Sequence, residues 1–469
     1  MDKKHSHSQT HYEVYFYHQL MISLGDNTFT HPNSFINKDI DYNLFHKIKF
    51  DDSPLTDRLT WHQFIATVCS EYKRLCQEDA QYIYSPFNDE RYIIIALAGM
   101  LSGKTVLSCD INDGRNIFYI DDLSISTDID YTETLNEIDK RIINKEVGYM
   151  VFYTSGSTGK PQTVHLSWYN IMIAVYSFIN DPYVDYSGYE TALHFLPHSH
   201  IYGFLMELMF IALGMRIYYT TAQNVYQSYL SIKPSIIPMV PAVLNKLYEK
   251  QLPLHLKLLI CAGAPLRADV AEFYKKTCRQ ILKGYGTTET SACILLSVNP
   301  DDDGICTAAN LIRIDDDGEL LVKGLSIGCV QTDNDGWYHT NDIVSIDSNR
   351  RLHIIGRKNN IIKLSQGEFV NLDELSNLYT YKSVDTIVYA SSLYRYPKAI
   401  VYVDDTIDRS SIPKLFNDIH ESNNRKGFER ITDIIIRDIK EMPLINGIKP
   451  NYKLIRENAI KSSTLLNKN

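Results

Sequence analysis

The chain has 469 residues, more than one compact hydrophobic core usually supports, so we expect at least two domains. Hydrophobic residues at 44% and charged residues at 22% are ordinary globular values. The formal net charge of −9 argues against a nucleic acid as the main partner.

Targeting and redox signals are weak. Eight cysteines are scattered without a CxxC pair or a paired metal-ligand spacing, which is typical of buried thiols in a reducing compartment. The N-terminus, MDKKHSHSQTHYEV, lacks the apolar run of a signal peptide. The most apolar stretches, Tyr92 to Leu101 and Phe204 to Leu213, are too short to span a bilayer. We therefore expect a cytoplasmic protein with no membrane span and two buried helices.

In chain order, a helix at 91–103 is followed by a strand at 104–109, and further short apolar runs occur at 149–152, 190–196, 215–220, 235–240 and 256–261. This alternation predicts an α/β fold whose parallel sheets are covered by helices, with sites at the carboxyl ends of the strands. Turns rich in Asp and Gly at 301–304 and 315–319 indicate a small β region. From residue 360 onward, strands at 383–390, 398–403 and 431–437 predict a separate small α+β domain.

The stretch Tyr153 to Val164, YTSGSTGKPQTV, is the strongest local signal. We expect it between a strand and a helix at 166–179. Its glycines allow close approach of backbone N–H groups to an anion, its hydroxyls can donate hydrogen bonds, and its lysine adds a positive charge. The spacing matches neither a Walker loop nor the GxGxxG fingerprint, so we set an NTPase aside.

Four later motifs complete the pattern. HFLPHSHIYG from His194 to Gly203 could form the wall of an apolar pocket, its histidines being either hydrogen-bonded wall residues or proton-transfer groups. GYGTTETS from Gly284 to Ser291 carries one acid, Glu289, suited to Mg²⁺. GWYHTNDIV puts Asp342 at the start of a strand, and GRKNNIIKLSQGEFVNLDEL follows from Gly356.

In this order the motifs closely resemble the adenylate-forming superfamily: acyl-CoA synthetases, the adenylation domains of peptide synthetases and carboxylic acid reductases, and luciferases. The resemblance spans residues 145 to 460 and is closest to the adenylation domain of carboxylic acid reductases, with long-chain acyl-CoA synthetases next. Two departures stand out. The phosphate loop continues Pro161-Gln162-Thr163 instead of Pro-Lys-Gly, and Asn341 replaces the Gly of Thr-Gly-Asp.

The resemblance implies binding of ATP and Mg²⁺, with an acid attacking the α-phosphate. It assigns the metal to Thr154 and Glu289, and the ribose hydroxyls to Asp342 and Arg357. The remaining nucleotide-binding residues are the loop Ser155, Gly156, Ser157, Thr158, Gly159 and Lys160, the run Gly263, Ala264 and Pro265, and the run Gly284, Tyr285, Gly286, Thr287 and Thr288, with Tyr285 stacking on adenine.

The resemblance also implies two domains, an adenylation core at 1–356 and a mobile C-terminal domain at 357–469. The latter would carry the catalytic lysine, Lys453, in a Pro-x-x-Lys-Leu pattern, with Lys449 as the fallback. Asn359 would be the hinge. The loop Ser365, Gln366, Gly367 and Glu368 would meet the thiol in the second half-reaction, where Gly367 lets a pantetheine arm pass.

The acid pocket would include His200, Tyr202, Phe204, Gly263 and Gly286. Because the run from His194 to Phe204 has no carboxylate to pair an α-ammonium, we expect a fatty or aryl acid. Only sixteen residues follow Lys453, so the thiol would come in trans, from an acyl carrier protein in preference to CoA. Two alternatives stay open: a stand-alone amino-acid adenylation enzyme, and a non-catalytic nucleotide-binding homologue.

Overall fold

The structure is a computed structural model and describes residues 22–25, 28–30, 40–48, 51–110, 115–127, 131–155, 161–181, 184–292, 294–298, 303–348, 351–380, 384–423, 425–445, 449–450 and 452–466. The chain divides into two compact units. The first contains residues 1–316, 320–340 and 346–353, and the second contains residues 317–319, 341–345 and 354–469.

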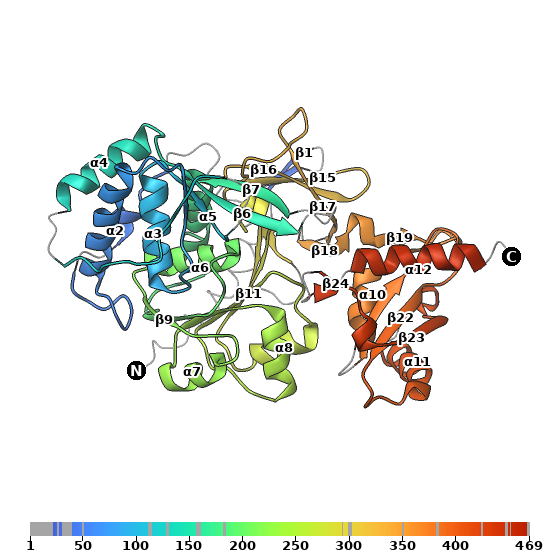
Figure 1. Ribbon diagram of the computed structural model, residues 1–469. Helices are drawn as coiled ribbons and strands as arrows, with labels where there is room; N and C mark the ends of the chain where they lie inside the picture. Colours follow the sequence, from blue (N-terminus) through green and yellow to red (C-terminus); the bar gives the residue numbers. More distant parts are fainter. Residues whose placement is uncertain are drawn as a thin grey trace, which may run out of the picture. The chain divides into compact units, whose positions relative to one another are not determined.

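The first unit begins with a five-stranded sheet in the order β5-β3-β4-β6-β7. Its strands are β3 (Tyr82–Tyr84), β4 (Thr105–Leu107), β5 (Ile117–Tyr119), β6 (Tyr149–Ser155) and β7 (Pro161–Ser167). All neighbours are parallel except β6 and β7, which are antiparallel. Three helices pack together beside this sheet (Figure 1): α2 (Trp61–Cys76), α3 (Glu90–Leu101) and α4 (Thr132–Ile143).

A seven-stranded sheet follows, in the order β14-β13-β12-β11-β10-β8-β9. Its strands are β8 (Thr191–His194), β9 (Arg216–Tyr219), β10 (Ile236–Met239), β11 (Leu258–Ala262), β12 (Ile281–Tyr285), β13 (Leu295–Ser297) and β14 (Ile305–Cys306). The five strands from β8 to β12 are parallel. Their carboxyl ends therefore meet at one edge, as expected for a binding site in an α/β sheet.

Five helices belong to this part of the chain: α5 (Trp168–Ile179), α6 (Ile201–Ala212), α7 (Val225–Ile232), α8 (Pro241–Glu249) and α9 (Ala268–Lys275). A third sheet has the order β1-β2-β15-β16-β17-β18, with β1 (Ile22–Gly25), β2 (Thr28–Thr30), β15 (Asn310–Ile314), β16 (Glu319–Gly324), β17 (Tyr338–Ile346) and β18 (Leu352–Arg357). The turn between β15 and β16 contains Gly318 with φ +85°, so the expected Asp/Gly turn at 315–319 is confirmed.

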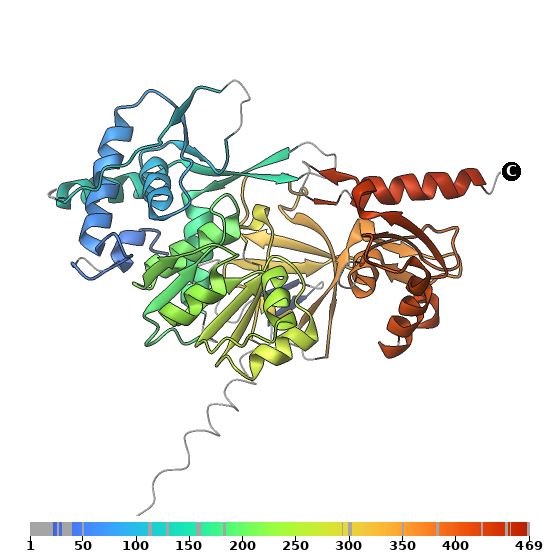
Figure 2. The same cartoon turned by 60° about the horizontal axis from the view of Figure 1, so that its bottom comes forward.

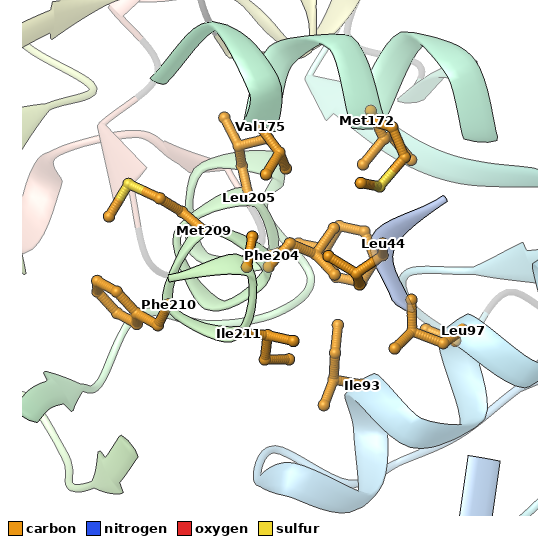
Figure 3. Packing of buried hydrophobic residues seen from close by; sticks show 14 of the residues in the cluster. Leu44, Ile93, Leu97, Met172, Val175, Phe204, Leu205, Met209, Phe210 and Ile211 are labelled. Atoms are coloured by element: carbon orange, nitrogen blue, oxygen red, sulfur yellow. The ribbon is translucent and has the colours of Figure 1, made fainter. Parts of the chain in front are cut away.

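The main core lies around α3, α5 and α6 (Figure 3). In α6 every residue except Tyr202 is buried, and in α3 every residue except Arg91. A helix that is buried on all sides must be apolar on all sides, which explains both hydrophobic runs and confirms the two expected buried helices. Among the described residues, the helices are too short or too polar to cross a membrane.

The second unit has its own core, built on the sheet β21-β22-β23. Its strands are β21 (Val384–Tyr389), β22 (Lys398–Val403) and β23 (Asp433–Asp438), with the short pairs β19 (Ile361–Lys363) and β20 (Phe369–Asn371), and β24 (Leu444–Ile445) and β25 (Lys449–Pro450). The helices are α10 (Leu372–Tyr379), α11 (Ile412–Ser422) and α12 (Tyr452–Leu466). Figure 2 shows α12 alongside the sheet, where Ile455 and Ala459 pack on Ile387 and Tyr389.

One expected element is wrong. The phosphate motif leads not into a helix at 166 but into β7, so it connects two antiparallel strands. The reason is the alternation after the motif: Val164 and Leu166 are buried, whereas His165 and Ser167 are partly exposed. The helix begins only at residue 168, where Ser167 and Asn170 form a capping box.

Candidate active site

The β6–β7 hairpin carries the phosphate motif. Thr154 lies near the end of β6, and its hydroxyl lies 3.5 Å from the Gln162 carbonyl oxygen of β7. Ser155 pairs with Pro161 at the last described position of the hairpin. The expected loop residues Gly156, Ser157, Thr158, Gly159 and Lys160 lie outside the described residues. The structure therefore positions the two strands that hold this loop.

The nucleotide-binding residues expected after residue 260 lie on two adjacent strands. β11 ends at Ala262, which is opposite Gly284 of β12, so Gly263, just after β11, and Tyr285, the last residue of β12, lie at the same edge of the sheet. Gly263 has φ +89°, while a Cβ atom there would meet only Val240 at 3.8 Å. Backbone conformation, not lack of space, favours glycine at this position. Ala264 and Pro265 follow Gly263, and Gly286, Thr287 and Thr288 follow Tyr285, at the same edge.

Glu289 lies in a 3-10 turn, Thr288–Thr290, that is closed by reciprocal hydrogen bonds between Thr287 and Thr290. The next two residues, Ser291 and Ala292, have φ +53° and +61°, so the chain reverses sharply here. The Ser291 hydroxyl donates to the Ser326 carbonyl at 2.8 Å. Hydrogen bonds thus fix the backbone on both sides of Glu289, whose side chain is partly exposed.

A segment that sequence reasoning missed, residues 325–329, joins this turn to the phosphate hairpin. The Gly328 N–H donates to the Glu289 carbonyl at 2.8 Å, and the Cys329 N–H donates to the His165 carbonyl of β7 at 2.9 Å. The Asn170 amide of α5 donates to the carbonyls of residues 325 and 327 at 2.8 Å each. These contacts bring the backbone of the Glu289 turn close to β7.

Gly328 is required for this contact. A Cβ atom at residue 328 would lie 2.8 Å from the His165 carbonyl oxygen and 2.5 Å from Leu166 Cδ2. Real Cβ atoms do not approach a carbonyl oxygen so closely without displacing it. The glycine therefore sets the separation between the hairpin and the Glu289 turn.

Asp342 and Arg357, both expected at the ribose, lie together in the second unit. Arg357 Nε is 3.1 Å from Asp342 Oδ1, and the aspartate is buried whereas the arginine side chain is half exposed. Asp342 is the fifth residue of the nine-residue strand β17, so its expected location at the start of a strand is wrong. Position 341 explains the motif's departure from Thr-Gly-Asp: Asn341 has φ +59°, a conformation that asparagine tolerates better than most residues.

Glu319, another residue that sequence reasoning missed, supports this pair. Its buried carboxylate accepts the Asn341 N–H at 2.9 Å and the Lys358 ammonium at 2.8 Å. Lys358 also contacts Asp317 at 2.5 Å, and the bonds to both acids raise the pKa of the lysine. One carboxylate thus holds the residue before Asp342 and the residue after Arg357.

Asn359, the expected hinge, lies in the 3-10 turn Lys358–Asn360. Lys358 is held as described above, and the Asn360 amide donates to Asp373 at 2.7 Å. Asp373 also accepts from Arg456 of α12 at 2.8 Å, and Arg456 Nε donates to the Val388 carbonyl at 2.9 Å. Asp373 therefore links the expected hinge to the helix that carries Lys453.

Lys453 is the second residue of α12, and Lys449 lies in β25. The structure does not describe either side chain, so it gives no distance from either lysine to the other expected residues. The backbone nevertheless places Lys453 three residues before Arg456, whose contacts hold the first turn of α12 against β21.

Gly367 lies in the loop between β19 and β20 with φ +98°, and a Cβ atom there would meet nothing within 4 Å. Ser365 N–H donates to the Tyr394 carbonyl at 2.9 Å, and Gln366 donates to the Arg395 carbonyl at 2.6 Å. Beside this loop is an open cleft of about 730 Å³, lined by Gln366, Glu368, Arg395, Tyr396, His420, Gly427, Phe428, Arg430 and Thr432. The expected thiol loop therefore borders a cleft with two arginines.

Three of the five expected pocket residues, His200, Tyr202 and Phe204, lie in different surroundings. His200 is exposed at the start of α6, Tyr202 is partly buried, and its hydroxyl lies 3.3 Å from the Met239 and Ile260 carbonyls. Phe204 is fully buried beside Leu205 and Leu44 in the main core (Figure 3). Their part in a substrate pocket stays a prediction.

Two histidines of the same run are buried. His198 contacts Glu207, which also accepts the Tyr219 hydroxyl at 2.5 Å, and His194 Nε2 lies 3.9 Å from Glu207. Burial alone would raise the pKa of Glu207, but His198, His194 and Tyr219 together hold it below its ordinary value. Burial lowers the pKa of His194 to about 4, against weaker opposition from Glu207, so this ring is neutral at pH 7.

Comparison with protein families gives a match to the family described as AMP-binding enzyme over residues 93–327. Among curated proteins, the chain is similar to long chain acyl-CoA synthetase 1 of Arabidopsis thaliana, with 28% identity over 55% of this chain and 52% of the relative. It is also similar to human long-chain-fatty-acid–CoA ligase 1, with 24% identity over 64% of this chain and 54% of that protein. The chain spans about half the length of these relatives.

Two solved structures share the fold. O-succinylbenzoate CoA synthetase from Bacillus subtilis, solved with its acyl-adenylate intermediate, matches 88% of this chain and 97% of its own at a TM-score of 0.68 and 16% identity. MatB from Rhodopseudomonas palustris, solved with ATP, matches 89% of this chain and 99% of its own at a TM-score of 0.64 and 16% identity. At this identity the likeness concerns the fold, and it confirms the expected α/β class.

Proposed function

The chain belongs to the AMP-binding enzyme family, and from that premise we propose that it uses ATP to activate a carboxylic acid as an acyl-adenylate and then transfers the acyl group to a thiol. The observation that carries this proposal is the connection through residues 325–329, which joins the phosphate hairpin to the Glu289 turn. A nucleotide polyphosphate needs hydroxyls, backbone N–H groups and a metal-binding acid close together, and this connection supports such a site.

In the first step, a carboxylate oxygen of the acid attacks the α-phosphate, the P–O bond to the β-phosphate breaks, and pyrophosphate leaves. Thr154, Ser155 and the residues that follow them in the sequence to Lys160 would hold the β- and γ-phosphates. Tyr285 would stack on adenine, while Asp342 and Arg357 would bind the ribose hydroxyls. A Mg²⁺ ion held by Thr154 and Glu289 would neutralise phosphate charge, a role that suits the oxygen donors of these two residues.

Lys453 would supply positive charge between the two anions that must meet. We assign it to a mobile C-terminal domain at 357–469, next to the adenylation core at 1–356. The hinge would be Asn359, a role supported by the anchors on both of its neighbours, Lys358 and Asn360. Rotation about it would withdraw the lysine and present the Gly367 loop for the thiol step.

The acid is proposed to be a fatty acid or an aryl acid. A buried carboxylate, Glu207, follows the His194–Phe204 run in α6, and its oxygens are engaged by His198 and Tyr219. It is therefore not available to pair the α-ammonium of an amino acid, which would be costly to bury alone. The names of the relatives, long-chain fatty acid ligases, favour a fatty acid.

The thiol is proposed to be that of CoA or of a carrier-bound phosphopantetheine. Both bear phosphates, and Arg395 and Arg430 in the cleft beside the Gly367 loop suit a phosphate-bearing acceptor. The names of the relatives favour CoA, whereas the sequence favours a carrier protein. The seven described cysteines are all free, as suits a reducing cytoplasm.

Product analysis by mass spectrometry tests the proposal. With ATP, Mg²⁺ and a panel of fatty, aryl and amino acids, we expect acyl-adenylate and pyrophosphate, and then AMP and a thioester when CoA or a carrier protein is added. Amides formed with added amines would instead indicate an amine acceptor. Binding of ATP with no product from any acid would support the non-catalytic alternative.

A further inference from the structure

A buried cluster lies where β8 leads into α6. It consists of His194 at the end of β8, His198 in the connecting loop, and Glu207 in α6. None of the three is more than 1% exposed. One potential ligand atom from each lies within 4.8 Å of the other two. Two imidazoles and a carboxylate are thus gathered in the interior, and none of the three residues is among those assigned to ATP.

The orientation of His198 is fixed by Asn88. The Asn88 amide oxygen lies 3.1 Å from His198 Nδ1 and 3.4 Å from the His198 backbone N–H. Because the same oxygen faces a backbone donor, it is an acceptor, and we assign the hydrogen of the ring to Nδ1. Nε2 of the neutral ring then carries a lone pair and faces Glu207 Oε2. A lone pair and a carboxylate oxygen in contact require a cation between them.

Tyr219 completes the orientation of the carboxylate. Its hydroxyl donates to Glu207 Oε1, which leaves Oε2 directed at both histidines. His198 donates its Nδ1 hydrogen to the Asn88 amide oxygen, and Glu207 accepts the Tyr219 hydroxyl hydrogen. Outer hydrogen-bond partners of this kind usually orient metal ligands.

His194 distinguishes a metal ion from a proton. Neither of its ring nitrogens has a hydrogen-bond partner among the described residues, although the ring is fully buried. The Leu196 main chain lies near the ring but outside hydrogen-bond geometry. A proton on His198 would satisfy only the His198–Glu207 pair. An ion between all three residues would also occupy the lone pair of His194, whose Nε2 is 3.9 Å from the same Glu207 oxygen.

We propose that His194, His198 and Glu207 bind a divalent transition metal of the Zn²⁺ class, with a water molecule in the fourth tetrahedral position. Two imidazoles and one carboxylate suit Zn²⁺, whereas Mg²⁺ prefers oxygen ligands. At Zn–ligand bonds of roughly 2.0–2.2 Å, tetrahedral ligand atoms lie about 3.4 Å apart. The separations in the cluster fall on both sides of that value, so adjustments of about 1 Å in side-chain position suffice.

The acids around the cluster favour a cation. Glu90 and Asp89, at the start of α3, act electrostatically on Tyr219, and Glu90 also acts on Glu207. Arg58, which is largely exposed, lies 3.6 Å from Glu90 and 3.3 Å from Asp89, and Arg91 pairs with Asp89 at 2.7 Å. A bound ion would fix the loop that ends at His200, and so would stiffen the wall proposed for the acid pocket.

The test is metal content of the full-length protein after equilibration with Zn²⁺ and dialysis against a weak chelator. We expect one more equivalent per chain in the wild type than in His194→Gln or His198→Gln. His255→Gln, which changes an exposed histidine outside the cluster, is the matched control and should keep the full content. With Co²⁺ in place of Zn²⁺, the visible absorption of a low-symmetry site should be present in the control and lost in His194→Gln.

Equal metal content in folded His194→Gln and His255→Gln would overturn the site, because the ion would then be bound adventitiously, for example by the N-terminal histidines. No retained ion in the wild type would also overturn it and would leave a protonated His198–Glu207 pair. If His194→Gln does not fold, Tyr219→Phe replaces it: loss of the orienting hydroxyl should weaken Zn²⁺ affinity about 10- to 100-fold. Unchanged affinity in Tyr219→Phe would count against the site.

Discussion

Removal of the Glu319 carboxylate should destabilise the backbone that holds the proposed ribose-binding residues, Asp342 and Arg357. In Glu319→Ala, Lys358 loses one of its two acidic partners but keeps its contact with Asp317. The stabilisation lost at Lys358 is therefore only a fraction of the roughly 1.5–3 kcal/mol typical of a hydrogen bond to a charged group. The Asn341 N–H loses the Glu319 carboxylate as its acceptor, which adds roughly 0.5–1.5 kcal/mol. The local opening free energy should therefore fall by about 2 kcal/mol, and amide exchange in the β17 peptide should accelerate more than tenfold.

Hydrogen exchange followed by mass spectrometry resolves this change without requiring two-state unfolding of a two-unit chain. Glu319→Gln should be intermediate, because its amide oxygen can still accept the Asn341 N–H. Glu272→Ala is the control. The Glu272 carboxylate is half exposed and forms a surface ion pair with Lys275 at 3.5 Å, which contributes little to stability, so we expect no measurable change in amide exchange of β17. ATP affinity should fall about tenfold in Glu319→Ala, since Asp342 follows Asn341 directly. Unchanged exchange and unchanged affinity would refute this account of Glu319.

Three further predictions concern the proposed reaction. Lys453→Ala should lower adenylate formation by at least about a hundredfold with ATP binding largely intact; normal adenylation in this variant, with loss in Lys449→Ala, would transfer the role to Lys449. Asn359→Pro should spare adenylation and depress thioester formation, because proline fixes φ at the hinge; equal loss of activity in both half-reactions would contradict rotation of the C-terminal domain about Asn359. Gly328→Ala should weaken ATP binding about tenfold in calorimetry, because its Cβ would push the His165 carbonyl away. Gly427→Ala, whose Cβ meets nothing within 4 Å, should have no effect, and equal affinities in the two variants would count against the 325–329 connection.

The sequence predicted the parallel strands well because each is a short apolar run followed by a turn. It failed at β7, where Val164, Leu166 and Trp168 are buried at alternate positions and then continue directly into a helix, so strand and helix periods overlap. It also showed that Asn341 departs from the family motif, but only the φ of +59° explains why asparagine fits there.

The supporting residues could not be predicted, because their partners are distant in the chain. Asn170 donates to carbonyls 155 and 157 residues away, and Arg456 binds an aspartate 83 residues away. No local period or spacing marks such pairs. The buried His198–Glu207 contact was missed for another reason: Glu207 lies within an apolar helix, and sequence reasoning treated the histidines only as wall or proton-transfer groups.

Acid-dependent exchange of labelled pyrophosphate into ATP tests the central claim most directly, because only reversible formation of an acyl-adenylate produces it. With the full-length protein and Mg²⁺, we predict exchange with at least one fatty or aryl acid and none without an acid. Binding of ATP with no exchange for any acid would contradict adenylation, and strong exchange with amino acids alone would contradict the proposed acid class.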